Sequence, residues 1–352
     1  MTASVAFVTP SYRLDRDRCA LLSRSLEACA PSFEHWIIVD RGDLQLFQSL
    51  RNHRTHVVAK EEVLPVWIRR LDTLKLGLRS NVWLQTRGVP IRGWLLQQFI
   101  KLAVAEKLTA DVLVHVDSDV VFLRPFSESA VVDGNGRVRL YARPNYVDET
   151  LPDHIRWHRS AEKLLGIGPA DLPMPDYISS LVPWRRSNAV ALLEHIQTTT
   201  GRHWLPALAS AWDVSEYTLY GRFAQDVLAT RAGQFVSPSS LCHDYYKRVP
   251  LSAPDLEALL DRLSPEEVAV SLTSKAGMRP DHYVELLERR WAGSSGREPA
   301  ADDSGKPRPT ASGRDSAERH GLTGGEITRY RVTWAAAALV ALLVVLLEFG
   351  VD

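Results

Sequence analysis

Two aspartates separated by a single residue give this chain its clearest chemical signal. Asp117 and Asp119 follow the apolar stretch VLVHV directly, and VVFLRPF comes after them. Because alternate side chains of an extended segment point to the same side, the two carboxylates are able to face one bound cation. Hard oxygen ligands of this kind suit Mg²⁺ or Mn²⁺, and such a cation would in turn bind a diphosphate.

A second pair of acidic residues, Asp213 and Glu216, lies at the start of a helix expected over residues 215–231. A carboxylate positioned there could remove the proton from an acceptor hydroxyl as a general base. Alternatively, Ser215 is the N-cap of the helix and Glu216 is a first-turn acid that the helix dipole stabilises. The spacing permits both interpretations, and it does not decide between an inverting enzyme, which needs a base, and a retaining one.

A third set of polar residues precedes the two aspartates. Trp94, Gln98 and Lys101 fall on one face of a helix expected over residues 92–108. If this face meets a binding site, Gln98 and Lys101 reach sugar hydroxyls and phosphate, since lysine is a compact charge for phosphate oxygens. Otherwise it is an ordinary solvated helix face.

The elements that must position these residues alternate along the chain. In order, the first are a strand over 4–9, a helix over 15–30, a strand over 35–39, a helix over 43–51 and a strand over 55–59. This alternation predicts a mostly parallel sheet flanked by helices. A further apolar strand over 111–116 ends at Asp117, and ligands of such sheets bind at the carboxyl ends of the strands. Later elements are strands over 137–142 and 178–182 and helices over 185–199, 253–263 and 281–291.

Composition narrows the class of protein. The 352 residues include 42 Lys and Arg against 42 Asp and Glu, and 45% are hydrophobic, which is typical of a globular protein with a full core. The balanced charge argues against a nucleic-acid-binding protein, whose surface is normally basic. Cys19, Cys29 and Cys242 form no CxxC pair, so neither a disulfide framework nor a zinc site is expected. The N-terminal MTASVAFVTP lacks the basic region of a signal peptide, which favours the cytoplasm.

The C-terminal part differs from the rest. We expect one globular domain over residues 1–291, a disordered Gly-, Ser- and Pro-rich linker over 292–328, and a single-pass transmembrane anchor over 329–352. The uninterrupted apolar run covers 334–347, which is shorter than the ~20 residues that span a bilayer comfortably, so docking onto the domain is the alternative. Two arginines precede the run, which places the domain on the cytoplasmic face of the cell membrane.

Several motifs, in a fixed order, resemble those of a poorly characterised bacterial group of GT-A-fold, DxD-containing nucleotide-sugar glycosyltransferases. They are VAFVTPSY, HWIIVDRGD, RGWLLQQFIKL, the passage around Asp117 and Asp119, WDVSEYTLYG and LCHDYY. The resemblance covers residues 4–291 and implies a GT-A-like, Rossmann-like α/β fold. It also implies a divalent cation (Mn²⁺ or Mg²⁺), a nucleotide-sugar donor, and a cell-envelope or lipid-linked glycan as acceptor.

The same resemblance implies roles for individual residues. Thr9, Pro10, Ser11 and Tyr12 would line the nucleotide pocket, where Tyr12 could stack on the base, and Asp40 would contact base or ribose.

The cation site that the resemblance implies uses residues far apart in the chain. Asp119 would bind the cation and Asp117 the cation or the ribose. His243, in LCHDYY, would be a third ligand because many GT-A enzymes complete the site with a late histidine; otherwise it is an ordinary loop residue.

Two other functions remain open. The passage from Asp117 to Val121 also fits the DxDxV strand end of haloacid-dehalogenase-like phosphatases, with Asp117 as nucleophile and Asp119 as acid and base. That family adds a downstream acidic pair, whereas Asp302 and Asp303 here lie in the expected linker. The other possibility is a membrane-tethered module that binds sugar nucleotides without turnover.

Overall fold

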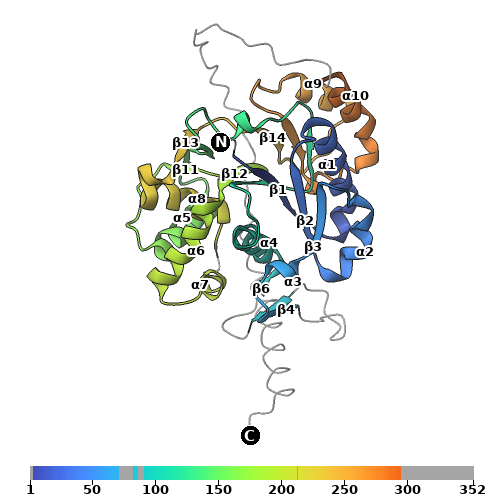
Figure 1. Ribbon diagram of the computed structural model, residues 1–352. Coiled ribbons are helices and arrows are strands. Elements are labelled where there is room, and N and C mark those ends of the chain that lie inside the picture. Colours follow the sequence, from blue (N-terminus) through green and yellow to red (C-terminus); the bar gives the residue numbers. More distant parts are fainter. Residues whose placement is uncertain (1–2, 71–81, 86–90, 212, 295–352) are drawn as a thin grey trace.

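The computed structural model of the protein describes residues 3–70, 82–85, 91–211 and 213–294. Its centre is a five-stranded sheet in the order β12-β7-β1-β2-β3 (Figure 1). The strands are β1 (Val5–Pro10), β2 (Glu34–Val39), β3 (Thr55–Ala59), β7 (Val112–Val116) and β12 (Leu181–Arg185). Within this sheet β7, β1, β2 and β3 are parallel, and β12 runs antiparallel to β7. The predicted α/β class with a mostly parallel sheet is confirmed.

The strand order creates a topological switch point between β1 and β7. The chain runs outward from β1 to β2 and β3 and returns on the other side of β1 as β7. Connections that leave neighbouring strands in opposite directions open a crevice at their carboxyl ends, and ligands of such sheets bind there. The loops that follow β1 and β7 meet at this crevice, where Ser118 contacts Asp15.

One face of the central sheet packs against α1 (Arg16–Cys29). The other elements on this side are a small sheet of β14 (Cys242–Tyr245), β15 (Ala269–Leu272) and β8 (Val120–Phe122), with α9 (Ala253–Asp261) and α10 (Val284–Ser294). The rings of Phe7 and Phe122 meet edge to face with centroids 5.4 Å apart. Because β8 begins directly after Asp119, this small sheet fixes the turn that carries the two aspartates.

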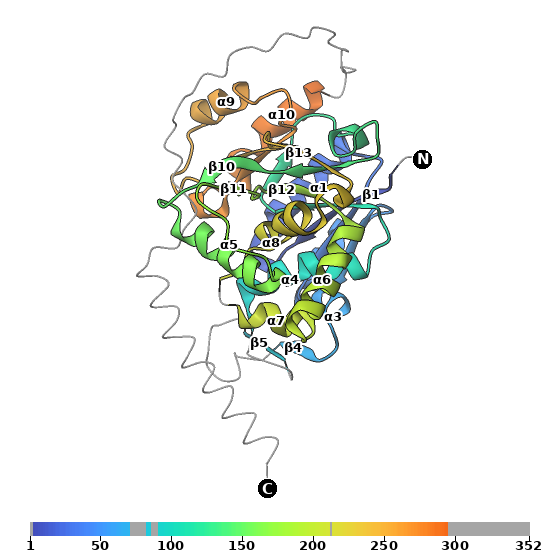
Figure 2. The same cartoon turned by 90° about the vertical axis from the view of Figure 1, so that its left-hand side faces the viewer.

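The opposite face is covered by helices (Figure 2). They are α4 (Gly93–Ala103), α6 (Arg186–Thr200), α7 (Trp204–Ser210) and α8 (Glu216–Arg222), with α5 (Pro152–Leu165) packed against α6 and α8. Trp184 of β12 stacks on Tyr220 of α8, with ring centroids 4.5 Å apart and planes 10° from parallel. Both rings are fully buried, so this stack fixes α8 against the sheet.

Shorter elements complete the described fold. β9 (Val138–Tyr141) pairs with β13 (Gln234–Ser237), and β10 (Arg143–Val147) pairs with β11 (Met174–Asp176). Another small sheet contains β4 (Ile68–Arg70), β5 (Val82–Gln85) and β6 (Ile91–Arg92), and two short helices are α2 (Leu44–Phe47) and α3 (Lys60–Val63).

Two of the expected elements have different bounds in the structure, and one helix was not expected. The helix predicted over 215–231 is regular only as α8, which passes into a π-helix over Phe223–Leu228 and a 3₁₀ turn over Ala229–Ala232. The strand predicted over 178–182 begins at Leu181, because side-chain contacts hold Ser179 and Ser180 outside it. Helix α5 was not expected from the sequence, since its buried face carries His158 and Glu162 rather than a purely apolar stripe.

The C-terminal predictions fall mostly outside the described residues. Helix α10 ends at Ser294, just inside the segment expected to be a linker, and the rest of the linker and the anchor over 329–352 are not described. None of the helices in the described ranges combines the length and apolar character that a membrane crossing requires.

Gly221 of α8 is the position where the packing of the helical side is most easily tested. A Cβ atom there would clash with the ring of Tyr177, so Gly221→Ala should lower the free energy of unfolding by about 1–3 kcal/mol, despite the better helix propensity of alanine. Urea unfolding measures the change. Gly42→Ala is the control because no atom lies within 4 Å of its added Cβ. Equal stability of the two variants would contradict the packing described here.

Candidate active site

The loops after β1 and β7 bring three carboxylates to the switch point. Ser118 Oγ donates to Asp15 Oδ2 over 3.4 Å, and Asp119 Oδ2 accepts from the backbone N–H of Ser274 at 3.2 Å. Burial, together with the neighbouring Asp117 and Asp15, raises the pKa of the Asp119 carboxyl to about 7. Burial raises the pKa of Asp15 as well. A cluster in which negative charge is this costly favours a cation beside it.

A buried lysine lies behind Asp117. Lys101 Nζ, on α4, is 3.1 Å from Asp117 Oδ1 and 3.1 Å from Glu216 Oε1, and it donates to the Tyr217 hydroxyl over 2.6 Å. The side chains of Lys101 and Glu216 are 8% and 6% exposed, whereas that of Asp117 is 43% exposed. Burial alone would lower the pKa of Lys101, but the acidic groups around it raise that pKa well above its usual value. Lys101 is therefore charged, and it links the partly exposed carboxylate of Asp117 to the buried carboxylate of Glu216.

Glu216 begins α8 and faces this lysine. Ser215 is the N-cap, as predicted, because its Oγ accepts from the backbone N–H of Thr218 at 3.3 Å. Burial raises the pKa of Glu216, and Lys101 opposes that rise. The structure places Asp213 beside α5, with its Oδ2 3.7 Å from Arg156 Nε. Of the two candidate bases, Glu216 is the one brought to Asp117.

The buried face of α4 contributes one more polar group. Gln98 is almost fully buried, and its Oε1 has no hydrogen-bond partner among the described residues. The side chain of Trp94 lies outside the part of the chain that the structure describes. Below Lys101, burial lowers the pKa of His115 of β7 well below its usual value, so this histidine is neutral. Its ring meets Trp184 with centroids 4.3 Å apart.

Asp244, not His243, faces the carboxyl edge of the central sheet. The two residues are neighbours on β14, so their side chains point to opposite faces. Asp244 accepts from Ser179 Oγ at 2.9 Å and from the N–H of Ser180 at 3.2 Å, next to the start of β12. Burial raises the pKa of Asp244 to about 6.

His243 pairs instead with Glu267, which lies just before β15. Its Nδ1 lies 3.2 Å from Glu267 Oε1, and this hydrogen bond raises the pKa of His243. β15 separates β14 from β8, and the strand register sets His243 level with Val121, about 10 Å away across two strand spacings. The structure therefore does not bring His243 to Asp119 as a third ligand.

The predicted nucleotide residues are mostly closed off. Thr9 and Ser11 are fully buried, and Thr9 Oγ1 hydrogen-bonds His35 Nε2 at 2.9 Å. Pro10 is buried as the last residue of β1, so none of these three residues is exposed to a ligand in the structure. Asp40 forms a buried ion pair with Lys60, Nζ to Oδ1 3.1 Å. Tyr12 is partly exposed.

The resemblance implies a divalent cation, and Asp117 and Asp119 are the carboxylates that would hold it. Within the described residues, no three His, Cys, Asp or Glu side chains are grouped so that they could hold a metal ion together. Mg²⁺ and Mn²⁺ do not need such a cage, since Mg²⁺ is usually bound by one or two carboxylates together with substrate phosphates and water. Asp117 and Asp119, with Asp15 adding negative charge, match that pattern.

Sequence reasoning missed four residues of this edge. Lys60 directly follows β3, just as Asp40 directly follows β2. Their equivalent positions after two neighbouring parallel strands are the signal that predicts their ion pair. Asp15 and Arg18 lie one turn apart at the start of α1, with Arg18 Nη1 3.4 Å from Asp15 Oδ1. Apart from their place after β1, nothing in the sequence indicates a role for them. Asp244 directly follows His243, the predicted third ligand, and only the orientation of β14 determines which of the two side chains faces the site.

The chain belongs to a family of unknown function, DUF6492, whose model matches residues 6–264. No curated protein matches the chain. Solved structures that align with it include the galactosyltransferase LgtC in complex with donor and acceptor sugar analogues. That alignment has a TM-score of 0.40 and 12% identity and covers 84% of this chain and 98% of LgtC.

A second solved structure is the bifunctional glycosyltransferase WbbM without ligands, with a TM-score of 0.43 and 12% identity. The alignment covers 83% of this chain and 50% of WbbM.

Removing the buried ammonium should destabilise the protein in a pH-dependent way. Lys101→Met leaves Glu216 and Asp117 without their counter-charge, so we expect a loss of about 3–5 kcal/mol in unfolding free energy at pH 8. Without Lys101 the pKa of Glu216 rises further above its unfolded value, so the loss should shrink as the pH falls toward 5. Urea unfolding at several pH values measures it.

The double variant Lys101→Met/Glu216→Gln serves as the control for this pair. Neutralising the buried acid should recover a large part of the loss, and the two changes should not be additive. Additive losses that do not vary with pH would show that the two charges are not coupled.

The raised pKa of Asp119 should also be visible in stability. Its folded value of about 7 lies above the ordinary value of 3.8, so the group stabilises the fold at low pH and this contribution is lost as the pH rises toward 7. In EDTA, Asp119→Asn should therefore gain at least about 1 kcal/mol relative to wild type between pH 5 and pH 8. Asp17→Asn, at an exposed site, should gain nothing, and equal pH profiles for both variants would contradict a costly charge at Asp119.

Proposed function

We propose that this protein is a metal-dependent glycosyltransferase that moves a sugar from a nucleotide-sugar donor to a glycan hydroxyl. One observation carries the proposal: Asp15, Asp117 and Asp119 gather at the β1–β7 switch point, with Glu216 held behind them by Lys101. A nucleotide sugar contains a diphosphate, which proteins usually bind together with a divalent cation. This cluster offers carboxylates that could hold that cation. The resemblance of the motifs from VAFVTPSY to LCHDYY supports the same function.

In the proposed reaction, the bond between the anomeric carbon and the diphosphate oxygen breaks, and a bond from that carbon to the acceptor oxygen forms. The acceptor hydroxyl loses its proton, and the leaving diphosphate takes up negative charge. A divalent cation held by Asp119 and Asp117 would supply charge neutralisation on the leaving group. The Lys101 ammonium, 3.1 Å from Asp117, adds fixed positive charge on the same side of the site.

Glu216 is the proposed acceptor of the hydroxyl proton. Its carboxylate is buried, which raises its pKa and strengthens it as a base, while Lys101, 3.1 Å away, opposes that rise. The other predicted base, Asp213, lies next to Arg156 rather than Lys101.

The nucleoside is proposed to lie over the carboxyl ends of β1 and β2. Tyr12 is partly exposed there and offers a ring for base stacking, while the Asp40–Lys60 ion pair closes the end of β2. A cell-envelope or lipid-linked acceptor and a cytoplasmic location at the membrane stay predictions that depend on residues 329–352, which are outside the described ranges.

Nucleotide binding tests the donor site directly. We expect the full chain to unfold at a higher temperature with one nucleotide class among UDP, GDP, CDP and their sugars when Mn²⁺ or Mg²⁺ is present, and not with EDTA. At 100 times the dissociation constant a ligand adds about 2.7 kcal/mol. Asp119→Asn should lose this shift, whereas Glu216→Gln should keep it and transfer sugar about 10²–10⁴ times more slowly.

The other functions predict different results in the same experiment. A phosphatase would show no metal-dependent nucleotide shift and would release phosphate from monoesters in an Asp117-dependent way. A binding module would show the shift but no turnover of any nucleotide sugar, with or without acceptors.

A further inference from the structure

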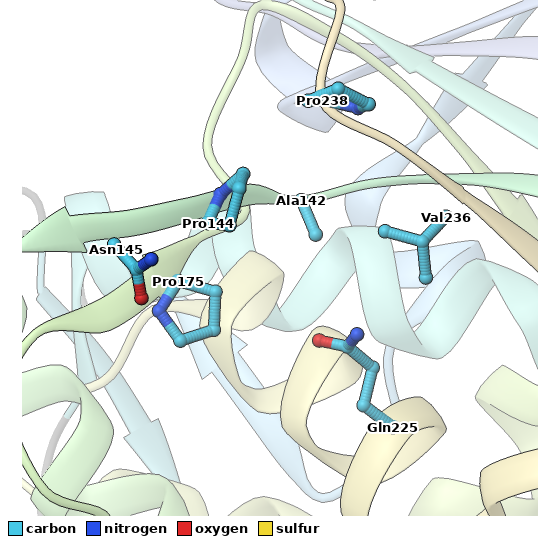
Figure 3. A pocket seen from close by; sticks show the side chains of 7 residues that line it. All are labelled: Ala142, Pro144, Asn145, Pro175, Gln225, Val236 and Pro238. Carbon is cyan, nitrogen blue, oxygen red and sulfur yellow. The ribbon is translucent and has the colours of Figure 1, made fainter.

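A cavity of about 300 Å³ lies on the helical side of the molecule, lined by residues other than the carboxylate cluster (Figure 3). Its apolar walls are Ala142, Pro144, Pro175, Val236 and Pro238. Two amide side chains, Asn145 and Gln225, complete the lining, so every lining residue is uncharged. Small-molecule sites of about this size combine apolar walls with a few placed polar groups in the same way.

Three segments of chain run from this cavity to the candidate active site. Pro175 is followed by the segment that ends at Ser180, whose carbonyl accepts from the N–H of Asp117 at 3.0 Å. Pro238 is followed by the segment that ends at Asp244. Ser240 on that segment and Ser179 on the first are joined through their hydroxyls, 2.8 Å apart. The cavity is therefore connected to the site through these two chain segments, on the side of β12 rather than of β2 and β3.

The third segment is helical and sets a distance. Glu216 begins α8, and Gln225 lies on the π-helix that continues it. At 1.5 Å per residue the two positions are about 13 Å apart along the axis. A ligand that reacts near Glu216 reaches the cavity only if it is longer than a single sugar ring.

The two amide side chains that line the cavity, Asn145 and Gln225, both lie on irregular backbone. Asn145 has a φ of +53° at a register shift between β10 and β11. Gln225 lies in the π-helix, and both bulged strands and π-helical turns occur preferentially beside functional sites. Gln225 Oε1 accepts from the Tyr177 hydroxyl at 2.5 Å, which leaves the amide NH₂ group as a donor. In Figure 3 the amide of Gln225 points from its helix toward Ala142 and Val236.

We propose that this cavity binds a neutral sugar unit of the acceptor, remote from the hydroxyl that reacts. The assignment rests on the proposed glycosyl transfer. A sugar presents a C–H face, which suits the proline and aliphatic walls, and hydroxyls, which suit the two amides. The lining offers no charged side chain to pair with a phosphate, sulfate or carboxylate group, so a neutral ligand fits it better. The acceptor is thus an oligosaccharide with an uncharged unit about 13 Å from Glu216.

Binding to the full chain tests the proposal with defined probes. Lactose, maltose, cellobiose and mannobiose are titrated against the wild type and three variants, with glucose 6-phosphate as the charged probe. Val236→Trp fills the cavity from a residue that is 53% exposed, and Asn145→Gly removes an amide while tolerating the positive φ. Val66→Trp, at a residue that is 85% exposed and outside the cavity lining, is the matched control.

We expect at least one disaccharide to bind the wild type and Val66→Trp equally. Val236→Trp should weaken that binding by about tenfold or more, and Asn145→Gly by a smaller factor. The proposal is overturned if no disaccharide binds, if Val236→Trp binds as well as the wild type, or if only the phosphorylated sugar binds.

The metal-dependent nucleotide shift is measured on the same variants and should be unchanged in all of them. Its absence from the wild type would reject glycosyl transfer itself. Disaccharide binding that depends on Val236 but occurs without that shift would overturn the assignment of the cavity to an acceptor. Failure of the cavity proposal and failure of the proposed function are therefore separate results.

Discussion

The buried ammonium of Lys101 is the interaction on which the candidate site depends. Glu216 and Tyr217 come from α8, Asp117 comes from the end of β7, and Lys101 comes from α4. One charge therefore joins the neighbouring elements α4 and β7 to a helix whose Tyr217 is 116 residues further along the chain. Without it, the buried Glu216 carboxylate and the half-exposed Asp117 carboxylate would repel one another with no positive charge between them. With Lys101 between them, a helix N-terminus and a strand end stay at the same crevice while Asp117 remains open to solvent.

The fold could be predicted from the sequence wherever burial alone determines the pattern. β1 and β7 are covered on both faces, so they read as continuous apolar runs, and Pro10 and Asp117 mark their ends. The same logic placed the two aspartates at a carboxyl edge. It failed for α5, where His158 and Glu162 are buried because Arg222 of α8 contacts both. Because the polar partner that allows these two residues to be buried is about 60 positions away, the local sequence shows no apolar periodicity that would predict the helix.

The candidate site shows the same division. The sequence identified Asp117, Asp119, Lys101 and Glu216, each next to a well-defined helix or strand. It could not identify which of two neighbours on β14 faces the crevice, because strand alternation gives opposite answers for a shift of one residue. The contact of Asp244 with Ser179 and Ser180 settles that orientation in the structure, and it depends on the packing of two separate sheets. Long-range pairing is therefore the information that local patterns lack.

Gly221 has a consequence beyond helix packing. It lies between Glu216 and Gln225 on one helical segment, with the Tyr177 ring against its Cα and the Tyr177 hydroxyl on Gln225. A helix held at its middle by a ring and near its end by a hydrogen bond does not slide or rotate against the neighbouring strand. The spacing between its two polar positions is then fixed, and under the proposed function an acceptor that engages both ends must match that spacing in length.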